Sequence, residues 1–134
     1  MKTHLLSLFG ILACPFLFSQ IITVNSGSSV SIPPNSSITL DGLKIAPANT
    51  YVISGANDVS RSATAATVES NRSVSRVYNS SSLLSGFTGT LTFSYLEGEL
   101  NDIEEGNLVL ELQANDDSWT TYNGTVDEVN NTVS

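Results

Sequence analysis

Apolar and polar residues alternate along much of this chain. Leu91, Phe93 and Tyr95 are separated by Thr92 and Ser94, and shorter stretches show the same pattern. Successive side chains of a β-strand point to opposite faces, so this alternation indicates strands with one face on a core and the other toward water. No stretch after residue 20 combines a helical pattern with capping residues. We predict strands over residues 21–24, 29–32, 37–40, 43–46, 51–54, 74–78, 88–96, 107–113 and 119–122.

The breaks between these strands carry turn-forming residues. Asp41-Gly42 predicts a tight hairpin, because both positions of such a turn must tolerate a positive φ. Residues 33–36, Pro-Pro-Asn-Ser, separate two strands, and Asp116-Asp117-Ser118 turns the chain before Trp119. Residues 57–73 are rich in serine, alanine, threonine and asparagine and leave two interpretations open. They hold either a short edge strand around residues 66–68 or a long exposed loop.

Many short strands separated by turns at intervals of roughly 8–12 residues are typical of a sandwich or barrel. We therefore expect an all-β protein, an immunoglobulin-like two-sheet antiparallel β-sandwich preceded by a signal peptide. The cysteine pair of antibody domains is absent, since the chain has 1 cysteine. Only the architecture of that fold is expected to be shared.

The first residues, MKTHLLSLFGILACPFLFSQ, have the form of a secretory signal. Lys2 and His4 give a polar start, and residues 5–18 are mostly apolar. The apolar run is shorter than the roughly 20 residues that span a membrane, and it contains a proline, so no membrane span is expected. We predict cleavage after Ser19, which gives a signal peptide over residues 1–19 and one β-sandwich domain over residues 20–134. The location implied is secreted or cell surface.

Lipidation at Cys14 is the alternative to ordinary cleavage. Ile11 lies three residues before Cys14 and Ala13 directly before it, as in lipoprotein signals. The mature chain would then begin with an apolar stretch, where such proteins are usually polar. The sequence leaves both routes open.

Composition after the signal excludes several classes of function. Lys2 is one of the 5 basic residues, so 4 remain against 13 acidic residues, a net charge of −9 that argues against nucleic-acid binding. The single cysteine and the single histidine also lie in the signal. The mature chain therefore lacks the residues for a disulfide, a Ser-His-Asp triad, a cysteine nucleophile or a His/Cys zinc site. We expect no enzymatic activity.

A cluster of carboxylates between two predicted strands is the strongest positive feature of the sequence. Calcium takes six to eight oxygen ligands, which clustered surface carboxylates can supply. The spacing is not that of an EF-hand, and a solvated acidic loop is the alternative interpretation. No other cofactor is expected. The candidate ligands are Glu97, Glu99, Asp102, Glu104 and Glu105.

Aromatic residues offer a second candidate site. Trp119 and Tyr122, with other tyrosines, could form a platform that binds sugars. The alternative is that Trp119 fills the core of the sandwich and that the tyrosines cover its rim.

Three stretches of the chain resemble a β-sandwich module of flavobacterial exported proteins. They are SITLDGLKIAPANTYVISG (37–55), RVYNSSSLLSGFTGTLTFSYLEGELNDIEEGNLVLEL (76–112) and SWTTYNGTVDEVNNTVS (118–134). In those proteins a strand ending in a "YLxxELN" phrase precedes an acidic loop, an "NLxLxL" strand and a "WT…VDxxNNTVS" segment. The resemblance implies a place in surface proteins and adhesins of the kind exported by the type IX pathway. It supplies no catalytic residues.

The sequence thus favours a secreted or cell-surface, non-catalytic module with an adhesive or structural role, whose partner is a surface polysaccharide or protein. The rival function is a carbohydrate-binding accessory module of a secreted hydrolase. Residues 125–134 contain only Val126, Val129 and Val133 as apolar residues, too few to close a sheet firmly. Because the resemblance implies further strands, we expect a missing closing strand and self-association through an open sheet edge.

Overall fold

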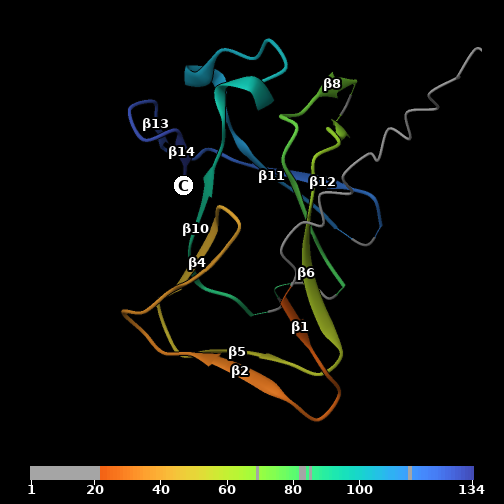
Figure 1. Ribbon diagram of the computed structural model, residues 1–134, viewed down its shortest axis with the longest axis vertical. Coiled ribbons are helices and arrows are strands. Elements are labelled where there is room, and N and C mark those ends of the chain that lie inside the picture. Colours follow the sequence, from red (N-terminus) through yellow and green to blue (C-terminus); the bar gives the residue numbers. More distant parts are fainter. Residues whose placement is uncertain (1–21, 69, 82–83, 85, 115) are drawn as a thin grey trace, which may run out of the picture.

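The computed structural model describes residues 22–68, 70–81, 84, 86–114 and 116–134. These residues form antiparallel β-sheets joined by turns, with two short 3₁₀ turns and no α-helix, so the all-β prediction is confirmed (Figure 1). The strands are β1 (Ile22–Val24), β2 (Ser29–Ile32), β3 (Ile38–Leu40), β4 (Leu43–Pro47), β5 (Tyr51–Ser54), β6 (Asn57–Ser62), β7 (Thr67–Val68), β8 (Asn71–Arg72), β9 (Val77–Ser80), β10 (Gly89–Ser94), β11 (Leu110–Gln113), β12 (Trp119–Tyr122), β13 (Val126–Asp127) and β14 (Thr132–Val133), and the 3₁₀ turns are η1 (Glu97–Glu99) and η2 (Glu105–Asn107).

The largest sheet has 5 strands in the order β13-β14-β10-β4-β3. Its centre is the long antiparallel pair β10–β4, in which Leu91 lies opposite Ile45 and Phe93 opposite Leu43. Directly opposite residues share a face of the sheet, so these four side chains form one apolar face, with Leu43 and Ile45 buried and Leu91 and Phe93 half-buried. The alternation seen in the sequence thus produces the main face of the core.

The second sheet has 3 strands in the order β1-β6-β9. Its central strand, β6, was not predicted, because Val59 is its only apolar residue and no alternation is visible. The long-loop interpretation of residues 57–73 is therefore wrong. The short-strand interpretation is closer, since Thr67–Val68 pairs with Asn71–Arg72 as a small hairpin.

The predicted turns are confirmed where the chain reverses between paired strands. Asp41 and Gly42 have φ values of 45° and 94° and join β3 to β4, as a tight Asp-Gly hairpin requires. Asp117, with a φ of 62°, lies in the turn between β11 and β12. There the Ala114 N–H donates a hydrogen bond of 2.8 Å to the Ser118 carbonyl O.

Two apolar clusters make up the core. The first cluster joins the two sheets. In it, Tyr78 of β9 packs edge to face against Phe93 of β10, with a distance of 5.3 Å between the ring centroids. The second, smaller cluster gathers Tyr95, Leu108 and Val133 beneath the acidic loop. The buried residues of the first cluster come from β1, β2, β4, β5 and β6, namely Val24, Ile32, Leu43, Ile45, Ile53 and Val59.

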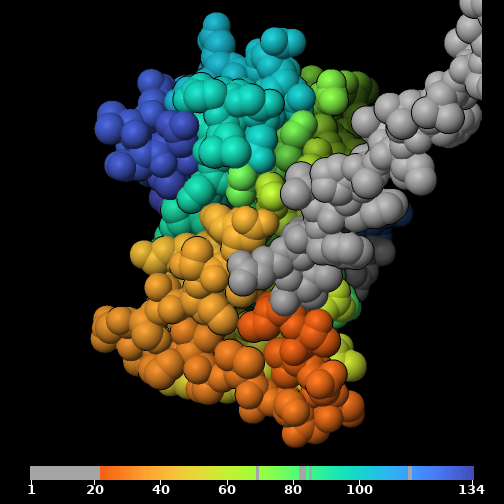
Figure 2. Space-filling view, in the orientation of Figure 1, coloured from red at the N-terminus to blue at the C-terminus, as the bar shows by residue number. Residues whose placement is uncertain are grey.

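The last ten residues join the five-stranded sheet, contrary to the expectation that their valines are too few for this. Thr125 and Ser134 exchange two backbone hydrogen bonds, of 2.7 and 3.0 Å, and Val133 is buried opposite Phe93. Val129 stays exposed. One buried valine and a ladder of backbone bonds are enough here, because β10 supplies a long strand to pair with. In Figure 2 this blue segment lies against the teal segment that follows β10.

The predicted signal peptide, residues 1–19, lies outside the described residues, as does Cys14. Within the described part of the chain, no helix is long and apolar enough to cross a membrane.

Candidate functional site

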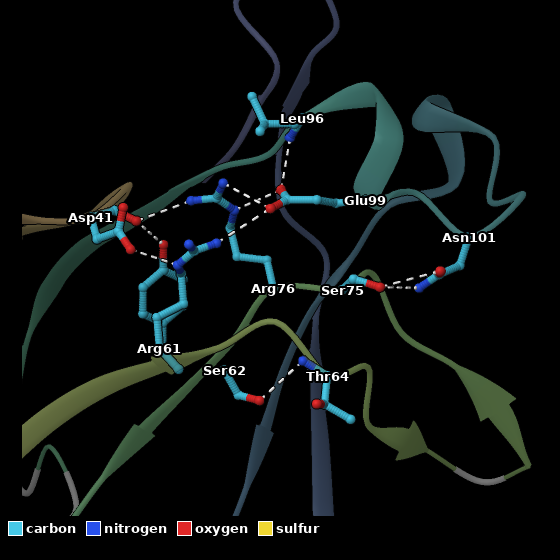
Figure 3. A network of polar contacts seen from close by, with 10 residues as sticks. Asp41, Arg61, Ser62, Thr64, Ser75, Arg76, Leu96, Glu99 and Asn101 are labelled. Atoms are coloured by element: carbon cyan, nitrogen blue, oxygen red, sulfur yellow. Dashed lines mark hydrogen bonds and ion pairs between the residues drawn. The ribbon is translucent and has the colours of Figure 1, made fainter. Parts of the chain in front are cut away.

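The Asp41-Gly42 turn is held by side chains from the opposite sheet (Figure 3). Its Asp41 carbonyl O accepts a hydrogen bond of 3.0 Å from Arg76 Nη1 and one of 2.6 Å from the Tyr78 hydroxyl. Its carboxylate accepts one of 2.6 Å from Arg61 Nε. Arg61 on β6 and Tyr78 on β9 are opposite each other in the ladder and so share the face turned toward the hairpin. The turn is therefore bound to the second sheet through its own backbone.

Glu99 completes this polar cluster from η1. Arg76 donates two hydrogen bonds to the Glu99 carboxylate, from Nε to Oε2 at 2.7 Å and from Nη2 to Oε1 at 3.0 Å. Arg61 Nη1 lies 3.3 Å from Oε1, and the Leu96 N–H donates a bond of 2.9 Å to Oε2. Bidentate arginine–carboxylate pairs are among the strongest polar contacts in proteins.

Burial alone would raise the pKa of Glu99. The hydrogen bonds from Arg76 and the Leu96 N–H, with the charges of Arg76 and Arg61, outweigh burial and hold this pKa below its ordinary value. Arg76 and Glu99 have side chains that are 9% and 15% exposed. We call Asp41, Arg61, Arg76, Tyr78 and Glu99 the turn clamp. Its two arginines and two carboxylates neutralise one another, so its role is to lock the hairpin, β6, β9 and the acidic loop together.

The other carboxylates of the predicted calcium site are directed to separate partners. Glu97 accepts a hydrogen bond from Asn131 Nδ2 at 3.0 Å, and Glu105 accepts one from the Tyr95 hydroxyl at 2.9 Å. Glu104 accepts one from Asn107 within the loop, and Asp102 is exposed. Among the described residues, no three histidine, cysteine, aspartate or glutamate side chains form a group that could hold a metal ion. The structure thus does not gather the five predicted ligands, and calcium binding stays a prediction.

Thermal melts of the protein in millimolar calcium and in EDTA test the calcium prediction. Calcium at 100 times its dissociation constant would stabilise the fold by about 2.7 kcal/mol, which raises the melting temperature of a domain of this size by roughly 10 °C. Glu99→Gln offers no clean site variant, because Glu99 belongs to the turn clamp; Asp102→Asn does. Equal melting curves in the two buffers contradict a calcium site.

Tyr95 shows how this loop is anchored. Its ring is 5% exposed and lies in the second cluster, while its hydroxyl reaches Glu105. Burial, with the neighbouring carboxylate of Glu105, raises the pKa of Tyr95 to about 12, so the phenol stays protonated and donates. Tyr95 is therefore part of the core and not of an aromatic platform.

The predicted aromatic ligand residues do not act together. Trp119 and Tyr122 are three positions apart on β12, and alternation along a strand places them on opposite faces. Trp119 is half-buried, whereas Tyr122 is 53% exposed. A sugar platform that uses both rings is not formed.

Trp119 instead lines a hollow formed by residues of several strands. The hollow has a volume of about 1010 Å³ and a mostly apolar lining. Leu91 and Phe93 of β10 and Leu110 of β11 also line it, and all three are half-buried. We call this hollow the lateral groove. Apolar side chains that a second layer would normally cover are here only partly covered.

Among the described residues, two strands that line the lateral groove are each paired with one neighbouring strand. β9 pairs with β6, and β11 pairs with β12; all four residues of β9 and all four of β11 line the groove. A strand at the edge of a sheet is a template for another strand.

Comparison with protein families, with curated proteins and with solved structures found no match to this chain.

Sequence reasoning missed the turn clamp. Asp41 was predicted as a turn residue alone, Tyr78 was one of the tyrosines of the possible sugar platform, and Arg61 and Arg76 were given no role. One clue was available in the composition. The chain after residue 20 has 4 basic residues, and 2 of them, Arg61 and Arg76, lie in or beside stretches that form strands. Because basic residues are so few, each of them is more informative about ion pairing than any one of the many carboxylates. The sequence does not indicate, however, which carboxylate each arginine binds.

Proposed function

We propose that this chain is a secreted or cell-surface, non-catalytic module with an adhesive or structural role, built as an immunoglobulin-like two-sheet β-sandwich. The observation that carries the proposal is the lateral groove, which is lined by β9 and β11, each paired with one strand among the described residues. A module that presents a sheet edge and partly covered apolar residues is suited to joining another polypeptide, which is how many adhesive and structural assemblies form.

The polar chemistry of the described residues also favours a structural role. The charged side chains that come together, those of the turn clamp, neutralise one another and hold backbone in place. Among the described residues, no buried side-chain nitrogen or oxygen lacks a hydrogen-bond partner.

The sequence resemblance to flavobacterial exported modules and the signal-like first residues supply the proposed location. The rival function, a carbohydrate-binding accessory module, depends on Trp119 and Tyr122, which β12 places on opposite faces. No other observation favours it.

Export and surface exposure are tested in the cells that make the protein. We expect an intact mass that begins at Gln20, and digestion of the protein when whole cells are treated with protease. A diacylglycerol-modified chain beginning at Cys14 would show that lipidation replaces ordinary cleavage. Deleting the gene should lower attachment of the cells to surfaces, and returning the full chain should restore it. Retention of residues 1–19 inside the cell, or unchanged attachment, contradicts the proposal.

A further inference from the structure

The sequence contains two pairs of residues that can close a ring within their own main chain. Asn123-Gly124 is its one asparagine–glycine pair, and Asp41-Gly42 is its one aspartate–glycine pair. In both, the main-chain nitrogen of the glycine can attack the side-chain carbonyl carbon of the preceding residue and form a succinimide. Glycine permits this attack because it has no Cβ to hinder the approach. The structure holds the two pairs differently, and this difference decides where the reaction can occur.

The Asp41-Gly42 pair is fixed by the turn clamp. The Asp41 carboxylate accepts a hydrogen bond of 2.6 Å from Arg61 Nε. The Asp41 carbonyl O accepts bonds from Arg76 Nη1 and from the Tyr78 hydroxyl. Ring closure turns the carboxyl group onto the Gly42 nitrogen, so it would break the ion pair with Arg61. The folded structure therefore opposes the reaction at Asp41.

The Asn123-Gly124 pair lies between β12 and β13 and has no such restraint. Within the described part of the chain, the Asn123 side chain has no hydrogen-bond partner, and the Gly124 N–H donates to none. Asn123 is exposed, and both residues line a mostly polar hollow of about 520 Å³, so water reaches them. The attacking nitrogen and the attacked carbon are therefore both available.

We propose that Asn123 is a site of spontaneous deamidation, with Gly124 as the nucleophile and water as the second reactant. The Gly124 nitrogen forms a bond with Asn123 Cγ, the bond from Cγ to Nδ2 breaks, and Nδ2 leaves as ammonia with the proton of the Gly124 N–H. Water then adds to one of the two ring carbonyl carbons and opens the ring. The product is aspartate if the new bond breaks and isoaspartate if the original peptide bond breaks. One water is consumed, one ammonia is released, and the protein gains one negative charge.

The isoaspartate product would disturb the strands that follow. Its main chain runs through the former side chain and is longer by one methylene group. Gly124 has little room for this shift, because even an added Cβ would lie 2.7 Å from the Ser134 carbonyl O. The next residue, Thr125, exchanges hydrogen bonds of 2.7 and 3.0 Å with Ser134, beside the pair Val126–Val133. We expect isoaspartate to loosen the β13–β14 hairpin. Aspartate leaves the main chain unchanged and should not loosen it.

Peptide mapping of the protein after incubation at mildly alkaline pH measures the reaction at both pairs. Deamidation of Asn123 raises the peptide mass by about one mass unit. A protein isoaspartate methyltransferase with a labelled methyl donor marks isoaspartate at either position. Each rate is divided by the rate at the same position in urea-unfolded protein, because asparagine reacts intrinsically faster than aspartate. We expect folding to slow Asn123 by less than tenfold and Asp41 by more than tenfold.

Two variants of the exposed Asn123 serve as controls. Asn123→Gln should abolish the mass change at this position, because glutamine would have to close a larger ring. Asn123→Asp supplies the charge of the product without the extra methylene group. Hydrogen exchange at the Thr125 and Ser134 amides should be at least tenfold faster in the chromatographically separated isoaspartate form, and within twofold of the original protein in Asn123→Asp.

Three outcomes overturn the inference. Folding that slows Asn123 by more than tenfold, or as much as it slows Asp41, would show that the structure does not leave this pair available. Faster loss of ammonia from another asparagine of the folded protein would place the site elsewhere. Equal hydrogen exchange in the isoaspartate form and in Asn123→Asp would remove the proposed effect on β13 and β14.

Discussion

Gly89→Ala is expected to lower the free energy of unfolding by about 3–5 kcal/mol and the melting temperature by roughly 10–20 °C. Gly89 begins β10 at a φ of 150°, directly opposite Pro47 on β4. A Cβ there would lie against the Ala46 carbonyl O, 2.7 Å from Pro47 Cα and 2.9 Å from Ala48 N. All three contacts are with backbone, which cannot give way as a flexible side chain can. The central strand pair of the larger sheet would have to separate at this end.

Two other glycines act as matched controls in the same thermal melts. Gly55 also has a positive φ, of 80°, but nothing lies within 4 Å of its added Cβ, so Gly55→Ala isolates the backbone cost of about 1–2 kcal/mol. Gly98 has open space around it and no positive φ, and Gly98→Ala should change stability by less than about 0.5 kcal/mol. Equal melting temperatures of the Gly89→Ala and Gly98→Ala proteins would contradict the close approach of β10 and β4.

The close approach at Gly89 illustrates what the sequence could and could not predict. Alternation located β10 and β4, because an apolar residue at every second position is a local signal. It did not indicate that the two strands pair with each other, or that Gly89 would lie against Pro47. Pairing is a contact between residues more than 40 positions apart, and only the packed structure specifies it.

β6 shows the opposite case, in which the local signal is absent. Its sequence, Asn-Asp-Val-Ser-Arg-Ser, has one apolar side chain, and its intrinsic strand preference is weak. It is nevertheless the centre of a sheet, because β1 and β9 supply hydrogen-bonding partners on both sides. Val59 supplies the buried contact and Arg61 the ion pairs. Tertiary pairing here overrides composition.

The candidate sites were partly predictable for the same reasons. The acidic loop was recognised because five carboxylates in nine residues are a local pattern. The sequence could not show that Glu99 turns inward to Arg76 while Glu97 turns to Asn131. Similarly, Trp119 and Tyr122 were paired as aromatic neighbours, although the strand places them on opposite faces. The lateral groove has no local signature at all, because its walls come from separate sheets.

Glu99→Gln is expected to destabilise the protein by about 2 kcal/mol at pH 7 and to lower its melting temperature by roughly 6–10 °C. The substitution keeps the shape of the side chain but removes the charge that two arginines face. Removing one partner of a fully buried ion pair costs about 3–5 kcal/mol of stability. The side chains of Glu99 and Arg76 are 15% and 9% exposed, so solvent reaches this pair and the expected loss is smaller. Glu111→Gln, at an exposed position on β11, is the control and should leave the melting temperature within about 2 °C.

The pH dependence distinguishes a charge effect from a change in packing. Because the turn clamp lowers the pKa of Glu99 below its ordinary 4.5, the stabilisation is fully present above that value and is lost as the pH falls through the lowered pKa. At pH 7 the original protein should therefore melt well above Glu99→Gln, and the two curves should converge as the pH falls through the lowered pKa, where Glu99 itself takes up a proton. Thermal melts from pH 7 to pH 2 measure this convergence. A gap that stays constant to pH 2 would mean that glutamine acts through altered hydrogen bonding of Arg76 and the Leu96 N–H, and not through charge.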